Sequence, residues 1–248
     1  EAEGHFQDCL ARFRQIRDSY YEARTLIELA CCADVQRQFD VAYAWRQAAI
    51  DVAHEAEDVF CQFLGLNDTG LGLLRQGEFA RSAVYYREAQ HLARAIGSPA
   101  REAWCMLNRG LIAFFMGNLP SVRAFASLAQ QQLQGTFDTY KAAYALYLHG
   151  LHQFAHRQYD EANETLLQAL AMDQGIRPDV HWVWSLTACE QQQMATARAH
   201  VQEAIRGWLP SHSPAFVLWA LPVAVVVLTH ERRLHEAVQM AALCATAC

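Results

Sequence analysis

Glycine and proline are scarce in this sequence, with 12 glycines and 6 prolines among 248 residues. So few turn-forming residues disfavour a β-protein with many tight turns and exclude collagen-like or low-complexity chains. Lysine is nearly absent, since Lys141 is the single example, and acidic residues outnumber basic ones by 26 to 20. A protein that binds nucleic acid regardless of its sequence needs a net basic surface, so we expect no nucleic-acid partner.

Signals for disulfides, zinc and membranes are also missing. The eight cysteines form no CxxC pair, and most lie in apolar helical stretches, which favours free thiols in a reducing compartment, here the cytoplasm. The longest apolar run, Ala215–Leu228, is 14 residues long, whereas a membrane-spanning helix needs about 20. The chain starts with neither a signal peptide nor an initiator methionine, so we expect it to be part of a larger protein.

What the sequence does contain is a repeat with a period of 40 residues. Three stretches align without gaps, starting at Gly70, Gly110 and Gly150. The same frame reaches upstream to Ala30 and, after a five-residue deletion, downstream to Ser185 and Val225. Each copy continues with a large apolar residue and then two mostly small ones, among them Ala42, Ala162 and Ala169.

Each copy is predicted to form two antiparallel helices joined by a short turn. In the fourth copy, residues 143–156 have apolar side chains at helical spacing, Arg157-Gln158 form the turn, and residues 159–172 resume the helical pattern. Two helices approach within about 8–10 Å only where the side chains at their crossing are small. We therefore predict that Gly70, Gly110, Gly150, Ala42, Ala162 and Ala169 are structural positions, and that stacked neighbouring hairpins complete the core.

This pattern resembles the tetratricopeptide repeat (TPR) family, whose small-residue and aromatic signature is matched by Gly110, Tyr159, Ala162 and Ala169. The period of 40 instead of 34, and the missing consensus tryptophan and proline, depart from the family and imply longer helices. HEAT repeats share the longer period but lack the small-residue signature, so they rank second. The resemblance implies an all-α fold, an α-solenoid of helix-turn-helix repeats wound into a right-handed superhelix.

The repeat frame divides the chain into one solenoid over residues 1–248. Residues 1–22 would hold the second helix of a truncated preceding repeat and a linker. The repeats would follow at about 23–62, 63–102, 103–142, 143–177, 178–217 and 218–248. The Glu57–Phe63 junction has no glycine or proline to turn the chain, and Pro222 conflicts with a helix in the last repeat because proline kinks or breaks helices.

In TPR arrays the first helices line a concave groove, so the resemblance implies a ligand surface position by position. Aromatic anchors would come from Trp104, Tyr144, Tyr147, Trp182 and Trp219, and a polar patch from Asn67, Asp68 and Asn108. Tryptophan and tyrosine are enriched in binding hot spots, and asparagine can bond both groups of a peptide backbone. The alternative is that these aromatic rings only pack between adjacent helices.

Signatures of catalysis are absent from the sequence. There is no P-loop, no GxGxxG and no GxSxG, and His230-Glu231 lack a second histidine at the HExxH spacing because His235 comes one residue late. His149, His152 and His156 share one helix face and could present imidazoles to a metal, or could simply fill packing and turn positions. We predict no enzyme activity, no cofactor and no metal site.

The expected function is therefore that of a protein- or peptide-binding module that contacts neighbouring domains of its parent chain. The stretch Leu92–Gly110 resembles the helical sensor regions of bacterial signal-transduction ATPases and of MalT-like and LuxR-type regulators. This resemblance implies a sensor role in signal transduction or transcription regulation. The alternatives are a passive scaffold and a receptor for small signalling peptides.

Overall fold

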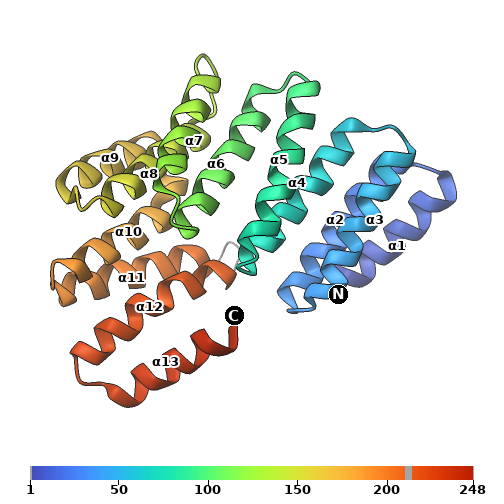
Figure 1. The fold of residues 1–248 in the computed structure, drawn as a ribbon. Coiled ribbons are helices and arrows are strands. Elements are labelled where there is room, and N and C mark those ends of the chain that lie inside the picture. Colours follow the sequence, from blue (N-terminus) through green and yellow to red (C-terminus); the bar gives the residue numbers. More distant parts are fainter. Residues whose placement is uncertain (1, 210–213, 248) are drawn as a thin grey trace. The chain divides into compact units, whose positions relative to one another are not determined.

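The computed structural model describes residues 2–209 and 214–247, and within these ranges it holds thirteen α-helices, a 3₁₀ turn at Gln174–Ile176 and no β-strand (Figure 1). The helices are α1 (Ala2–Ile16), α2 (Ser19–Val35), α3 (Phe39–Glu55), α4 (Val59–Arg75), α5 (Phe79–Ala95), α6 (Pro99–Phe115), α7 (Leu119–Gln132), α8 (Thr139–Ala155), α9 (Tyr159–Met172), α10 (Arg177–Glu190), α11 (Met194–Trp208), α12 (Pro214–His230) and α13 (Leu234–Ala247). The predicted all-α class is confirmed.

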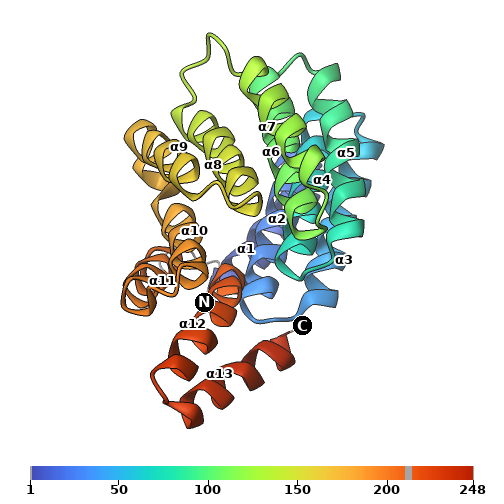
Figure 2. The same ribbon diagram turned by 60° about the vertical axis from the view of Figure 1, so that its left-hand side comes forward.

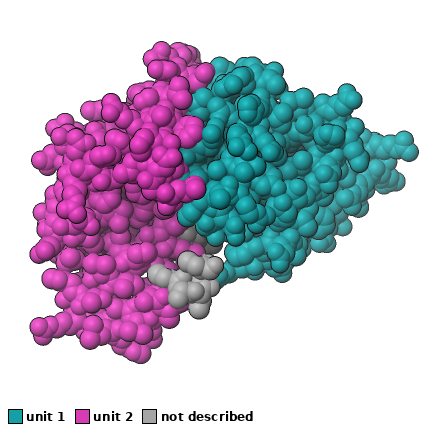
Figure 3. Space-filling model, in the orientation of Figure 1, with its two compact units in different colours: residues 1–112 teal, residues 113–248 magenta. Residues whose placement is uncertain are grey.

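Internal contacts divide the chain into two compact units, residues 1–112 and residues 113–248 (Figure 3). In unit 1, α1 packs on α2, the hairpins α2/α3 and α4/α5 contact each other, and the first helices α2 and α4 touch. In unit 2, α8 contacts α10 and α10 contacts α12, so first helices again meet first helices. Figure 2 shows the hairpins α10/α11 and α12/α13 of unit 2 next to each other.

The hairpins begin four residues before the predicted repeat boundaries over most of the chain. The first helices of the hairpins start at Ser19, Val59, Pro99 and Thr139, which keeps the 40-residue interval, and then at Arg177 and Pro214. Hairpins that stack in chain order with a fixed period are the arrangement of an α-solenoid, so this part of the fold prediction is confirmed. The division into a single domain and the handedness of the superhelix stay predictions.

The turns between helices explain how the chain reverses at Glu57 without glycine. Residues with positive φ recur every twenty positions, at Arg17, Arg37, Glu57, Gly77, Gly97 and Gly117. At Glu57 φ is 55°, the Glu57 N–H donates to His54 O at 3.0 Å, and the Asp58 N–H donates to Ala53 O at 2.9 Å. This left-handed end of α3 satisfies the last carbonyls of the helix, and Asp58 then accepts from Cys61 N–H to cap α4.

Small residues lie where the two helices of a hairpin cross. A Cβ atom on Gly70 in α4 would come 3.0 Å from the ring of Tyr86 in α5, and one on Gly150 in α8 would come 2.8 Å from Leu166 Cδ2 in α9. The repeated alanines on the second helices are buried, namely Ala42, Ala49, Ala89, Ala129, Ala162 and Ala169, and Gly110 is buried on α6. These close approaches leave room for one large ring or branched side chain at each crossing.

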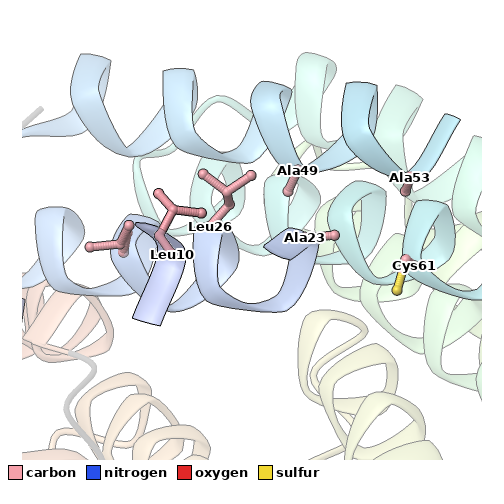
Figure 4. Packing of buried hydrophobic residues seen from close by; sticks show 7 residues of the cluster. Leu10, Ala23, Leu26, Ala49, Ala53 and Cys61 are labelled. Atoms are coloured by element: carbon pink, nitrogen blue, oxygen red, sulfur yellow. The ribbon is translucent and has the colours of Figure 1, made fainter. Parts of the chain in front are cut away.

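The core of unit 1 is built from side chains of four successive helices. Figure 4 shows Leu10 of α1, Ala23 and Leu26 of α2, Ala49 and Ala53 of α3, and Cys61 of α4 in one cluster. Each of these side chains is buried. Cys61 behaves here as a small apolar residue, because burial raises the pKa of its thiol to about 12 and keeps the thiol neutral.

The apolar last hairpin contains proline inside a helix. Helix α12 runs through Pro222, which is exposed to solvent. Pro222 has no N–H to donate to Leu218 O, its partner in a regular helix. The next carbonyl along, Trp219 O, accepts a hydrogen bond from Trp182 Nε1 at 3.1 Å. Among the described residues, no helix has the length and apolar character needed to cross a membrane.

Candidate functional site

Asp68, predicted to bind a ligand, is part of an ion network inside unit 1. Arg46 on α3 donates from Nε to Asp68 Oδ2 at 2.7 Å, and its terminal nitrogens donate to Asp34 of α2. The arginine side chain is only 2% exposed. Burial alone would lower the pKa of Arg46, but the bond to Asp34 and the charges of both carboxylates outweigh burial, so the pKa is raised. Asp68 therefore holds α3 to α4.

Glycine makes room for this buried arginine. A Cβ atom on Gly72 of α4 would come 2.6 Å from a terminal nitrogen of Arg46, so the guanidinium occupies the space that a side chain would fill. Sequence reasoning missed Arg46 because one arginine on an otherwise apolar helix face gives no pattern. The signal that could have found it is the pair Asp34 and Asp68, whose charges need a buried partner.

The other predicted polar residues of unit 1 are also turned inward. Asn108 on α6 is buried and donates from Nδ2 to Trp104 O, one turn earlier on the same helix, at 2.9 Å. The side-chain oxygen of Asn67 is buried without a hydrogen-bond donor among the described residues. Trp104 is half-buried. Of the four predicted groove residues in unit 1, Trp104 is therefore the one that keeps a partly accessible ring. The buried amide of Asn108 is bonded to its backbone.

A second polar network, unnoticed in the sequence, joins α5 to α6. Glu102 is buried and accepts from Gln90 at 3.3 Å and from Arg94 Nε at 3.1 Å. Arg109 in turn donates to the side-chain oxygen of Gln90. Paired and bonded in this way, the buried carboxylate of Glu102 is compensated, and the network fixes the start of α6 against the preceding hairpin.

Aromatic rings gather in unit 2 on α10, on α12 and on the last residues of α6. Trp182 of α10 is buried at the centre, with ring centroids 6.4 Å from Phe114, 6.1 Å from Phe115 and 6.0 Å from Trp219. Phe115 and Trp219 lie 4.6 Å apart, as do Phe216 and Trp219. We call these residues, together with Trp208 of α11, the aromatic cluster: Phe114, Phe115, Trp182, Trp208, Phe216 and Trp219.

The cluster combines a fixed centre with accessible edges. Trp182 is held by its hydrogen bond to Trp219 O and by the ring of Trp208, which lies 6.5 Å away. Phe114, Phe115, Phe216 and Trp219 are each half-buried. Trp182 and Trp219 were predicted site residues, and the structure brings them together. Trp208 and Phe216 were not predicted, because Trp208 is on a second helix and Phe216 falls outside the groove positions.

Tyr144 and Tyr147 are placed differently from the expectation. Their rings lie 5.2 Å apart on α8, Tyr144 is 6% exposed, and Tyr147 is fully buried. The Tyr147 hydroxyl has no hydrogen-bond partner among the described residues, and burial together with Asp179 raises its pKa well above the usual value. Tyr147 is therefore a core residue and not part of the groove to which the sequence assigned it, since a ring with no exposed surface cannot contact a ligand.

A carboxyl group with an unusual pKa lies beside these aromatic residues. Burial raises the pKa of Asp179 on α10 to about 7, although its backbone and a hydrogen bond with Trp208 act in the opposite direction. Asp179 also contributes to raising the pKa values of Tyr140 and Tyr147. Near neutral pH this side chain therefore exchanges between its protonated and charged forms, which links the stability of unit 2 to pH.

His149 and His152 of α8 and His156, the residue after this helix, form no metal site within the described part of the chain. His152 and His156 stack with ring centroids 4.3 Å apart, and His156 Nδ1 lies 2.9 Å from His152 O. No group of three histidine, cysteine or acidic side chains in the described residues is arranged to hold a metal ion. Their surroundings are polar.

Comparisons with known proteins do not assign this chain to a family. No protein-family model matches the sequence, and no curated protein matches it. Among solved structures the chain is similar to one titled "TPR2AB-domain:pHSP90-complex of yeast Sti1", with 13% sequence identity and a TM-score of 0.39, covering 91% of this chain and 98% of that one. At this identity and TM-score, the likeness leaves the family of this chain unassigned.

Proposed function

We propose that this chain is a non-enzymatic TPR-like module that binds a protein or peptide through the aromatic cluster of unit 2. The observation that carries the proposal is the set of four half-buried rings around a buried tryptophan. Large rings with accessible edges are the side chains that dominate binding hot spots, because they offer much contact area at low entropic cost.

The position of the cluster supports a peptide or partner helix as the ligand. The four half-buried rings come from α6 and α12, the first helices of two hairpins that are not consecutive in the chain, so a partner that touches all four would contact both hairpins at once. The backbone of the half-buried Trp219 is held by the hydrogen bond from the buried Trp182 to Trp219 O, and a rigid anchor loses little freedom when it is bound. An apolar strip with fixed anchors suits the apolar face of a helix or an extended segment.

In unit 1 we propose Trp104 as a further anchor. It is half-buried, and its backbone carbonyl accepts a hydrogen bond from the buried Asn108. The amide of Asn108 is therefore used within α6 and does not itself touch a ligand. Asn67 and Asp68 are left with structural roles in this proposal. The partner would therefore be recognised by aromatic contacts more than by amides.

The test uses an array of unrelated synthetic peptides probed with the purified chain. The same array is probed with Phe115→Ala and Trp219→Ala, and with Phe137→Ala as the control, because Phe137 is a fully exposed ring in the loop before α8. We expect peptides that bind the unchanged chain and Phe137→Ala but lose binding to the two cluster variants. No peptide above background, or equal binding by all variants, would reject the proposal.

We further propose that the module is the partner-sensing region of a larger bacterial signalling ATPase or transcriptional regulator. The resemblance of Leu92–Gly110 to such sensor regions supports this role. The complete gene tests it: an adjoining P-loop ATPase or helix-turn-helix domain is the expected result. A gene encoding neither would favour a passive scaffold or a receptor for small signalling peptides.

A further inference from the structure

A polar cleft of about 490 Å³ lies between α7, α8 and α9 in unit 2. Its walls include Arg123 and Ser127 of α7, His149, His152 and Gln153 of α8, and Gln168 of α9. A second hollow of about 620 Å³ shares Arg123 and His152 and adds His156. None of the residues of the aromatic cluster lines either hollow, so a ligand here is independent of the proposed partner surface.

The charge of this cleft is opposite to that of the chain. The formal net charge of the chain is -6, but neither hollow is lined by a carboxylate. Arg123 is exposed and forms no ion pair with any residue that the structure describes. A guanidinium that faces three imidazoles and no acid makes a locally basic site.

One buried polar atom in the cleft also lacks a partner. The side-chain oxygen of Gln153 is buried and accepts no hydrogen bond from the described residues. Leaving a buried polar atom unsatisfied is costly, and such an atom calls for an explanation such as an absent water or ligand. A ligand with an N–H or O–H group next to its charged group would satisfy Gln153.

The electrostatics distinguish an anion from a metal ion. Burial lowers the pKa values of His149 and His152, and Arg123 lowers both further, while no acid opposes it. A metal cation placed between these rings would be repelled by the same guanidinium, whereas an anion would be attracted. Arginine presents a planar fork that matches two oxygens of a phosphate or carboxylate.

We propose that this cleft binds an oxyanion of the phosphate type carried by a small polar molecule. Arg123 binds two oxygens of the anion, His149 and His152 donate from ring nitrogens, and Gln153 accepts from a neighbouring donor of the ligand. The histidine face that the sequence singled out is then an anion site. Its residues come from the second helix of one hairpin and both helices of the next, so binding would fasten α7 to α8 and α9.

Binding at this site is linked to pH through its histidines. The charged or titratable groups lining the two hollows are Arg123 on α7, His149 and His152 on α8, and His156 just after the end of α8. Helix α9 contributes only amides and a hydroxyl. A bound anion favours the imidazolium form and raises the histidine pKa values. Affinity for an anion of constant charge therefore rises as pH falls through the histidine range and is weakest at alkaline pH.

Sulfate is the probe, because it stays a dianion between pH 5 and 8. Nuclear magnetic resonance titrations follow the imidazole signals of the full chain as sulfate replaces chloride at constant ionic strength. We expect saturable shifts of the His149 and His152 signals, and affinity that increases severalfold from pH 8 to pH 6. Arg123→Gln should weaken binding about tenfold or more, whereas Arg87→Gln, an exposed arginine in unit 1, should leave it unchanged.

Two further measurements keep the proposal falsifiable. Gln168→Arg adds a second guanidinium at the exposed rim and should tighten sulfate binding, while Gln168→Glu should weaken it. Phosphate and phosphate esters of small polyols, compared with sulfate at one pH, test for the neighbouring donor that Gln153 would satisfy, and the esters should bind more tightly. Non-saturating shifts with sulfate, equal binding by Arg123→Gln, or stoichiometric Zn²⁺ binding without any sulfate binding would overturn the proposal.

Discussion

Arg46 and Asp68 form a hydrogen-bonded ion pair of 2.7 Å within unit 1. The arginine side chain is 2% exposed and the aspartate side chain 16% exposed. A charge at this depth needs a partner, because removing one member leaves the other buried and uncompensated. Asp68 thus fastens the second helix of one hairpin to the first helix of the next, and its charge is not available to a ligand.

Replacing this carboxylate tests the structural role. Asp68→Ala should lower the free energy of unfolding by about 3 kcal/mol, at the lower end for a broken buried pair because Asp34 still binds Arg46. Asp51→Ala on α3, the helix that carries Arg46, removes an exposed carboxylate and should change the free energy of unfolding by less than about 0.5 kcal/mol. Urea unfolding measures both, and equal effects would mean that the ion pair contributes nothing.

Glycine at position 72 is predicted to be irreplaceable for steric reasons. Gly72→Ala would bring a Cβ atom 2.6 Å from the Arg46 guanidinium, so we expect a loss of about 1–3 kcal/mol. Gly4→Ala is the matched control, because nothing lies within 4 Å of its Cβ position on α1. There the higher helix propensity of alanine should stabilise the chain by up to about 1 kcal/mol. Thermal unfolding of the two variants should therefore shift in opposite directions.

The left-handed turn at Glu57 is strained for a residue with a side chain. Its φ of 55° costs an ordinary residue about 1–2 kcal/mol, part of which glycine would avoid. Glu57→Gly should stabilise the chain because it relieves this strain. The gain should not exceed about 1 kcal/mol, because glycine also loses more conformational entropy on folding. Gly77→Ala makes the reverse change at a φ of 79° with open space around its Cβ position and should destabilise it. Chemical unfolding curves that move the same way for both would contradict this account.

The raised pKa of Asp179 predicts a pH-dependent stability difference. Between its usual pKa of 3.8 and the folded-state value of about 7, the folded chain holds a proton that the unfolded chain has released, so this group lowers stability as pH rises. Asp179→Asn removes the ionisation. Its gain over the unchanged chain should grow from pH 4 to pH 7, exceed about 1 kcal/mol, and level off above pH 7. Urea unfolding at several pH values across this range checks the shape of this pH dependence. The control is Asp160→Asn, which removes an exposed carboxylate on α9, and its stability difference from the unchanged chain should not vary with pH.

The fold could be predicted because its determinants are local and periodic. Small residues every 40 positions specify where helices cross, and Gly70 against Tyr86 shows why only a small residue fits there. The hairpin starts were placed late because the first turn of each first helix, such as Val59–Gln62, carries no repeated residue. The turn at Glu57 could not be foreseen, because its left-handed conformation is imposed by the helices on either side.

The candidate site was only partly predictable because periodicity places a residue on a helix face without showing what packs on that face. Trp182 and Trp219 were found, and they lie together. Tyr147 occupies the repeat position equivalent to Trp182, but its side chain has no exposed surface and belongs to the core. Asp68 was expected to face a ligand, yet its carboxylate is taken up by an arginine 22 positions earlier in the chain. Such pairings depend on distances between helices that no single repeat encodes.

The measurement that tests the central claim most directly is the affinity of one array-selected peptide for matched variants. Fluorescence anisotropy with that labelled peptide gives dissociation constants for the unchanged chain, Trp219→Ala and Phe137→Ala. We predict that Trp219→Ala weakens binding by about tenfold or more, as loss of a hot-spot aromatic residue should, and that Phe137→Ala binds as the unchanged chain does. The same dissociation constant for Trp219→Ala and the unchanged chain would show that the aromatic cluster is only core and does not recognise the partner.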